Sequence, residues 1–200
     1  VAWFVQRPAP PVSADPRIGQ SVLAADLATK AAQVQLTDQG KTVALTRRAD
    51  GNWIVPSYYD FPADFSKLTQ LVSDLTAAKI QRLVTTRSDR LGRLEFKDAG
   101  VKLNDDAGKE LWALALGKNA EGGGRFVRYG AEEKGYQANL NLWLDVEAKN
   151  WANAVLLDLK PDDVSSLAIG FADGTSVTAS RAKKEDQWTA ADAPAGKRIK

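Results

Sequence analysis

The most regular feature of the chain is an alternation of apolar and polar residues that begins near position 33. Val34 and Leu36 alternate with polar neighbours, residues 38–40 are typical of a tight turn, and residues 42–46 alternate again. A second turn containing glycine leads to a short apolar run at 53–55. Because a strand shows every second side chain on one face, this pattern predicts a hairpin followed by a third short strand.

The period of the pattern changes after Pro62, where a helix can begin. The apolar positions then recur at helical spacing, at Phe65, Leu68, Leu71, Val72 and Leu75. A stripe of this kind is typical of a helix with one face against the core. The sequence therefore predicts one long amphipathic helix over residues 62–78.

The remainder of the first 160 residues is dominated by strand and turn signals. Residues 111–116 are apolar at every position, which indicates a strand that is apolar on both faces and therefore predicts a central strand. Residues 147–157 are expected to form a short helix or turn packed on the sheet. The fold class is therefore α+β, mostly antiparallel sheet with one long amphipathic helix. Further strands are expected at 80–84, 101–103, 125–129 and 136–138.

The opening pattern recurs near the end of the chain. Residues 167–171 alternate, a Gly-containing turn follows, residues 177–179 form a return strand, and Trp188 follows a polar turn. Trp53 and Trp188 are 135 positions apart (188 − 53). This predicts a duplicated strand–turn–strand–Trp unit, although two unrelated hairpins can match by chance. The second copy reaches no helix. We therefore expect a first module at 21–160 and the start of a second, truncated module at 161–200. On this interpretation Lys200 is not the natural end.

The first sixteen residues contain two unlike stretches. Residues 1–5 are apolar, and residues 8–16 contain four prolines, which excludes a helix or a central strand there. Five residues cannot span a bilayer, which needs about twenty. The stretch is either an ordinary frayed terminus or the last turn of a membrane helix followed by a spacer.

Composition removes several classes of chemistry. The chain has no histidine and no cysteine, which excludes Ser-His-Asp and Cys-His catalysis, thiolate sites and His-ligated zinc. The net charge is only +2, from 27 basic and 25 acidic residues, so no basic stripe indicates nucleic acid. We expect no enzymatic activity and no cofactor.

Two patterns resemble ligand sites but have the wrong spacing. The glycine run at 122–124 lies between two predicted strands, whereas a phosphate loop joins a strand to a helix. The pairs Asp105-Asp106 and Asp162-Asp163 lack the spacing of a calcium loop and lie at turns, where aspartate bonds its own backbone. The sequence therefore indicates no catalytic, cofactor-binding or metal-binding residue.

Tryptophan is the more informative residue type. Four of the six lie in apolar surroundings and are expected in the core: Trp53, Trp112, Trp151 and Trp188. Trp143, next to Leu142 in an alternating stretch, has two interpretations. It is either a further core residue or, with Leu142, part of an exposed docking surface.

Several short motifs follow one another in a distinctive order: Gly19–Leu23, Gly40–Arg47, Asp50–Trp53, Phe61–Asp64, Leu91-Gly92, Leu116–Lys118, Gly124–Arg128, Trp151 and Leu156–Leu159. Taken in this order, the motifs resemble the family called domain of unknown function 4340, over about Gly19 to Trp188. The departure from the family pattern is a short charged stretch at 87–97.

The resemblance implies a location and a function. Such proteins usually have one N-terminal membrane helix followed by repeated β-rich modules, and are commonly encoded beside an ABC-type ATPase and a permease. Residues 1–20 are then the remnant of a membrane anchor and its linker, and the rest of the anchor helix is absent from this chain. We expect a non-catalytic accessory subunit on the periplasmic side of the bacterial inner membrane, whose partners are the permease and associated membrane proteins. The alternative is a binding module for an envelope glycan or lipid.

Overall fold

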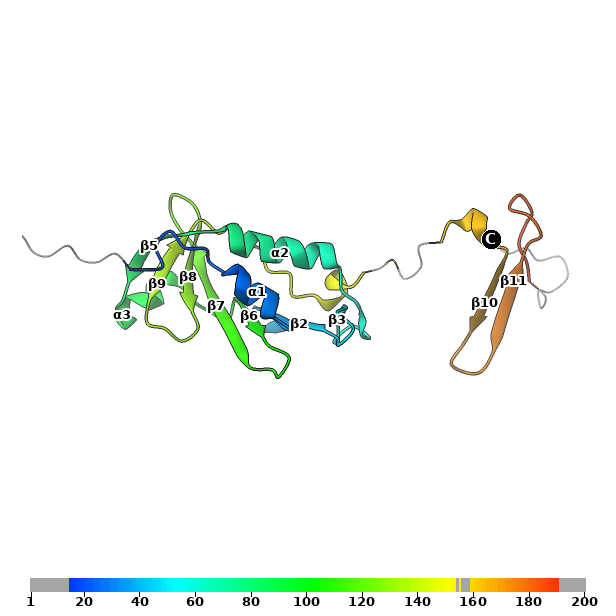
Figure 1. Cartoon of the computed structure of the whole chain (residues 1–200), viewed down its shortest axis with the longest axis horizontal. Coiled ribbons are helices and arrows are strands. Elements are labelled where there is room, and N and C mark those ends of the chain that lie inside the picture. Colours follow the sequence, from blue (N-terminus) through cyan, green and yellow to red (C-terminus); the bar gives the residue numbers. More distant parts are fainter. Residues whose placement is uncertain (1–14, 154, 156–158, 191–200) are drawn as a thin grey trace, which may run out of the picture. The chain divides into compact units, whose positions relative to one another are not determined.

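A computed structural model describes residues 15–153, 155 and 159–190, and divides the chain into two compact units at 1–153 and 154–200 (Figure 1). The division lies seven residues before the expected module boundary at 160 (160 − 153). The first unit holds a large sheet with a helix along it, and the second holds a small three-stranded sheet.

The first unit is built on a nine-stranded sheet with the order β4-β3-β2-β1-β6-β7-β8-β9-β5. All of its strand pairs are antiparallel, so the expected α+β class with mostly antiparallel sheet is confirmed. The strands are β1 Gln33–Asp38, β2 Lys41–Arg47, β3 Trp53–Val55, β4 Phe61–Pro62, β5 Ile80–Thr85, β6 Gly100–Asn104, β7 Glu110–Asn119, β8 Arg125–Tyr129 and β9 Gly135–Ala138.

The helix that covers this sheet, α2, is shorter than expected. It runs from Phe65 to Ala77, and Asp64 caps it by accepting a hydrogen bond from Lys67 N at 3.1 Å. The prediction of a long helix over 62–78 was therefore wrong at its start, because Pro62 pairs with Ile54 as part of strand β4. Phe65 was also misplaced in the buried stripe, since its side chain is 63% exposed.

One face of the sheet carries the core. Leu68, Leu71 and Leu75 of α2 are buried in the same cluster as Leu36 and Leu114 of the sheet. Residues 113 and 115 of β7 point to the opposite face and are half-buried. Strand β7 lies between β6 and β8, so the predicted central position is confirmed. The sheet therefore has a covered face and a largely open face.

Short helices complete the first unit. None of the helices in the described ranges is long and apolar enough to cross a bilayer. The expected short helix near 147–157 is the 3-10 turn η2, and residues 154 and 156–158 of that range lie outside the described residues. The short helices of this unit are α1 Ala25–Lys30, α3 Ser88–Leu91, η1 Gly92–Leu94 and η2 Ala148–Trp151.

The second unit repeats the strand order of the first three strands. After the 3-10 turn η3 (Pro161–Asp163), β10 (Ser166–Gly170) pairs with β11 (Ser176–Ser180), and β11 pairs with β12 (Thr189–Ala190). Both pairings are antiparallel, as are those of β1, β2 and β3. The two segments thus share the order and direction of strands that a repeated unit requires.

The tryptophans divide between core and surface. Trp112 and Trp151 are buried, with 8% and 3% exposure, as expected. Trp53 and Trp188 are only half-buried. Trp53, the first residue of β3, still packs against the core cluster, so its assignment is confirmed in part. Trp188 directly precedes the edge strand β12, where few neighbours cover a large ring, and its assignment to the core was wrong.

Candidate functional site

The extended segment that follows β9 carries a highly exposed tryptophan. Along residues 140–144 every second side chain is buried, at Leu140, Leu142 and Leu144, and all three belong to the core cluster. Trp143 lies between them on the opposite side and is 87% exposed. Of the two sequence interpretations, the structure therefore supports exposed Trp143, with Leu142 buried behind it at 8% exposure.

Contacts with neighbouring elements fix the backbone on both sides of Trp143, at Leu142 and at Asp145. Arg125 donates from Nη1 to Leu142 O at 2.9 Å and from Nε to Gly117 O at 2.7 Å. Burial of the guanidinium lowers the pKa of Arg125. Further along, Lys67 Nζ lies 2.6 Å from a carboxylate oxygen of Asp145. The exposed indole is therefore presented from a held backbone, which reduces the entropy lost on binding.

A polar hollow of about 300 Å³ lies beside Trp143. Asp38 and Lys118 bring opposite charges to its wall, and Asn119 and Asn141 add amide groups. An aromatic side chain next to polar groups of both signs is typical of the centre and rim of a protein interface. We call this surface, made of Trp143, Asp38, Lys118, Asn119 and Asn141, the Trp143 surface.

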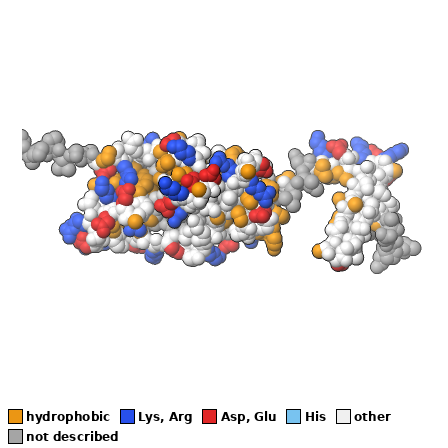
Figure 2. Space-filling model, turned by 60° about the horizontal axis from the view of Figure 1, so that its bottom comes forward, with side chains coloured by type: hydrophobic (Ala, Val, Ile, Leu, Met, Phe, Trp, Pro, Cys, Tyr) orange, Lys and Arg blue, Asp and Glu red, His pale blue; other side chains and the backbone are white. Residues whose placement is uncertain are grey.

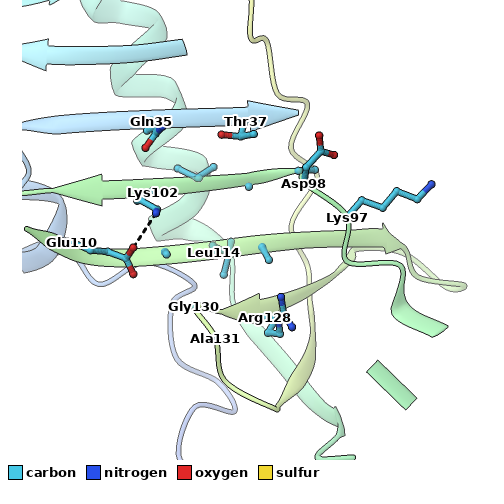
Figure 3. Close-up of a pocket in the computed structure, with 15 residues that line it drawn as sticks. Gln35, Thr37, Lys97, Asp98, Lys102, Glu110, Leu114, Arg128, Gly130 and Ala131 are labelled. Carbon is cyan, nitrogen blue, oxygen red and sulfur yellow. Dashed lines mark ion pairs between the residues drawn. The ribbon is translucent and has the colours of Figure 1, made fainter. Parts of the chain in front are cut away.

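The open face of the sheet contains a shallow depression of about 470 Å³ (Figure 3). Its floor is made of small residues on two central strands, Gly100, Ala113 and Ala115. Longer side chains from the same face stand around the floor, including Lys102 and Glu110, which form an ion pair at 3.1 Å. The depression is open and polar, unlike the enclosed apolar pockets that hold small molecules.

Arg128 stands at the side of this depression without an ion-pair partner among the described residues. Its guanidinium lies 5.2 Å from the ring centroid of Phe96. Its buried Nε makes no hydrogen bond with the described part of the chain. The cation is thus held by an aromatic ring rather than by a carboxylate.

A third surface lies in the turn between β3 and β4. Tyr59 is 85% exposed, and its ring packs edge-on against Tyr58 at 5.4 Å between centroids. Tyr59 and Asp60 both have left-handed backbone, with φ of 53° and 55°, a conformation that costs free energy outside glycine. Sequence reasoning missed this turn, although adjacent aromatic residues in a turn are a signal of a contact surface.

In the first of the two carboxylate pairs, Asp105 bonds the backbone of its own turn, as the sequence indicated. Asp105 Oδ1 accepts hydrogen bonds from Ala107 N at 3.0 Å and Lys109 N at 2.8 Å. Asp162 and Asp163 belong to η3. Within the described ranges no three acidic residues gather closely enough to hold a metal ion.

Comparison with known proteins gives one match. A family model described as a domain of unknown function (DUF4340) matches residues 53–200, which is 148 of 200 residues (200 − 52). The matched range includes parts of both units and excludes β1 and β2. No curated protein and no solved structure matches the chain.

Proposed function

Because the chain belongs to the family described as a domain of unknown function (DUF4340), we propose that it is a non-catalytic accessory subunit of an ABC-type transport system. The proposal places it on the periplasmic side of the bacterial inner membrane, where it acts through contacts with the permease and associated membrane proteins. The family resemblance implies a transport partner, and the anchor is a helix that precedes residue 1 in the full-length protein.

The observation that carries the proposal is the exposure of Trp143. A tryptophan that is 87% exposed leaves a large apolar area in water, and such residues are enriched at the energetic centres of interfaces. The neighbouring leucines are in the core, so the indole is held at the surface by buried residues. The Trp143 surface is accordingly the proposed site of contact with the transporter.

Pull-down of the full-length protein from solubilised membranes tests the proposal. The permease and the ATPase are expected to co-purify with the wild type. Trp143→Ala is expected to reduce their recovery about thirtyfold, which corresponds to about 2 kcal/mol for an interface hot spot. Tyr59→Ala is the matched control, because it removes an aromatic side chain of similar exposure from another surface.

Other outcomes separate this proposal from its rivals. Glycan or lipid retained by the purified protein, in the absence of permease and ATPase, favours the envelope-binding alternative. Equal loss with Trp143→Ala and Tyr59→Ala contradicts the assignment of the surface. A soluble cytoplasmic protein after cell fractionation, or a domain resistant to protease added to the outer face of the membrane, contradicts the location.

A further inference from the structure

An apolar groove of about 220 Å³ is bordered by helices α1 and α2 in the first unit, and we call it the α1–α2 groove. Its floor is formed by Val34 of β1 and Leu103 of β6, both buried in the core cluster. Ala28 of α1 lines one side. The groove therefore lies on the covered face of the sheet, and its lining, unlike that of the polar depression on the open face, suits the apolar part of a ligand.

One face of α2 forms the longest wall of the α1–α2 groove. Four of its residues line the groove at the spacing i, i+3, i+4 and i+7, which places them along one face of the helix: Phe65, Leu68, Thr69 and Val72. Seven residues of helix cover roughly 10 Å, at about 1.5 Å per residue. Sites for drug-sized ligands are larger, at about 300–1,000 Å³, so the α1–α2 groove has room for one short chain.

Among the described residues that line the α1–α2 groove, Arg47 is the only charged one. It stands directly opposite Trp53 in the pairing of β2 with β3, so the two side chains lie on the same face of the sheet. The adjacent Arg48 lies 3.7 Å from a carboxylate oxygen of Asp60, whereas Arg47 has no ion pair within the described ranges. Arg47 is also exposed, so an anionic group beside it keeps contact with water and loses little hydration. The charge and the apolar lining together are complementary to an anion that carries a hydrocarbon chain.

We propose that the α1–α2 groove binds a free medium-chain fatty carboxylate. The alkyl chain lies between α1 and α2, and the carboxylate accepts hydrogen bonds from the guanidinium of Arg47, whose planar fork matches a carboxylate. A phospholipid carries two long chains, for which the groove is too small. The inference is independent of the proposed transport function, because the groove shares no residue with the Trp143 surface.

Titration calorimetry of the 200-residue chain with octanoate, below its micelle concentration, tests the proposal. The extended chain of octanoate has about the length of the groove, and we expect saturable binding of one molecule per chain. Octanol has the same chain length and a neutral head group, so it is expected to bind at least about tenfold more weakly, because it lacks the charge-assisted hydrogen bonds. In NMR spectra, octanoate is expected to shift the amide signals of Leu68 and Val72 and the indole signal of Trp53.

Variants separate the head-group contact from the apolar contact. Arg47→Ala is expected to weaken octanoate binding at least about tenfold and to leave octanol binding unchanged, which also shows that the groove is still folded. Arg48→Ala is the matched control, because it removes a neighbouring cation that does not line the groove, and octanoate affinity is expected to stay the same. Val72→Trp fills the groove and is expected to abolish binding of both molecules.

Four outcomes overturn the proposal. They are no saturable octanoate binding, equal affinities for octanoate and octanol, and equal losses of octanoate affinity in Arg47→Ala and Arg48→Ala. The fourth is binding of the chain to phosphatidylglycerol vesicles that Val72→Trp abolishes and octanoate does not displace, since the occupant is then a membrane lipid. None of these outcomes changes the recovery of permease and ATPase expected for the wild type and for Trp143→Ala, so the two proposals fail separately.

Discussion

At the scale of single residues, Arg17 joins the N-terminal part of the described chain to residues more than 100 positions away, which no local sequence pattern predicts. Its guanidinium donates to both carboxylate oxygens of Glu132, at 2.5 and 2.7 Å, and lies 4.2 Å from the ring centroid of Tyr129. Beside it, Lys134 Nζ lies 2.9 Å from Asp15 Oδ2. These contacts fix residues 15–17 to β8 and to the loop before β9.

Replacement of Arg17 by alanine is expected to reduce the free energy of unfolding of the first unit by about 1 kcal/mol at pH 7. The expected loss is small because the Arg17–Glu132 ion pair is partly exposed to solvent. It is the sum of a weak ion pair and a cation–π contact with Tyr129. Arg17→Lys keeps the charge but loses the two-point geometry, so it is expected to recover only part of the loss. Urea unfolding of the three proteins measures the effect, and equal stability of all three contradicts it.

The same contacts give a pH dependence with a definite sign. The Arg17 hydrogen bonds lower the pKa of Glu132, and the hydrogen bond from Lys134 lowers the pKa of Asp15. A carboxylate whose pKa is lower in the folded state stabilises the fold at pH values above its pKa in the unfolded chain, which is near 4. This contribution is lost as the pH falls through the pKa of the folded state. Stability of the wild type is therefore expected to fall more steeply than that of Glu132→Gln between pH 5 and the acid limit of folding. If the free energies of unfolding of the wild type and of Glu132→Gln depend on pH in the same way, this assignment is contradicted.

At the scale of elements, helix α2 supplies the test of the core. Leu71→Ala is expected to destabilise by about 2–5 kcal/mol, because a buried leucine loses its contacts and leaves a cavity. Phe65→Ala, on the same helix, is expected to cost well under half as much, since its ring is mostly exposed. Thermal or urea unfolding compares the two, and similar losses indicate that the ring of Phe65 is covered in solution.

A close approach between η1 and β7 depends on a glycine. A Cβ on Gly117 meets the Leu94 carbonyl oxygen at 2.4 Å, closer than any normal contact, whereas a Cβ on Gly92 meets nothing within 4 Å. Gly117→Ala is expected to cost about 1–3 kcal/mol as η1 shifts from the sheet, and Gly92→Ala is expected to be neutral or slightly stabilising. Unfolding free energies of the two variants test this, and a neutral Gly117→Ala shows that η1 is held loosely.

The strands were the elements that the sequence predicted best. Alternation identified β1 and β2 because one buried face imposes a period of two on the side chains, whereas a continuous apolar run identified β7. The start of α2 was misplaced because Phe61 and Pro62 pair with β3 in a short hairpin, which helical spacing does not report. Phe65 fits the spacing of the stripe, but it lies on the first turn of α2, at the border of the covered area.

The candidate surfaces were harder to predict for a related reason. The pattern around Trp143 indicates that the ring is opposite to Leu142, but which side faces the core depends on Arg125 and on the sheet below. The turn at Tyr59 depends on two left-handed residues that no local pattern requires. Exposure of a large ring is thus decided by tertiary packing, and sequence leaves both interpretations open.

At the scale of the whole molecule, charge does not single out a surface. Figure 2 shows basic and acidic side chains interspersed over the visible face of the first unit. With 27 basic and 25 acidic residues there is little net field to steer a partner. Recognition by this protein is therefore expected to depend on local shape and exposed rings rather than on long-range attraction.

The two units differ in how well their sheets are covered, and this predicts unequal local stability. In β1 and β2 the inward side chains are 0–2% exposed, whereas Leu167, Ile169 and Val177 of the second unit are 43–47% exposed. Amide exchange proceeds through local opening, which is easier where few apolar contacts must be broken. Amides of β1 and β2 are thus expected to exchange at least about a hundredfold more slowly than those of β10 and β11, measured by hydrogen exchange on the intact 200-residue chain. Comparable protection in both hairpins contradicts the prediction, because it requires that Leu167, Ile169 and Val177 are covered in solution.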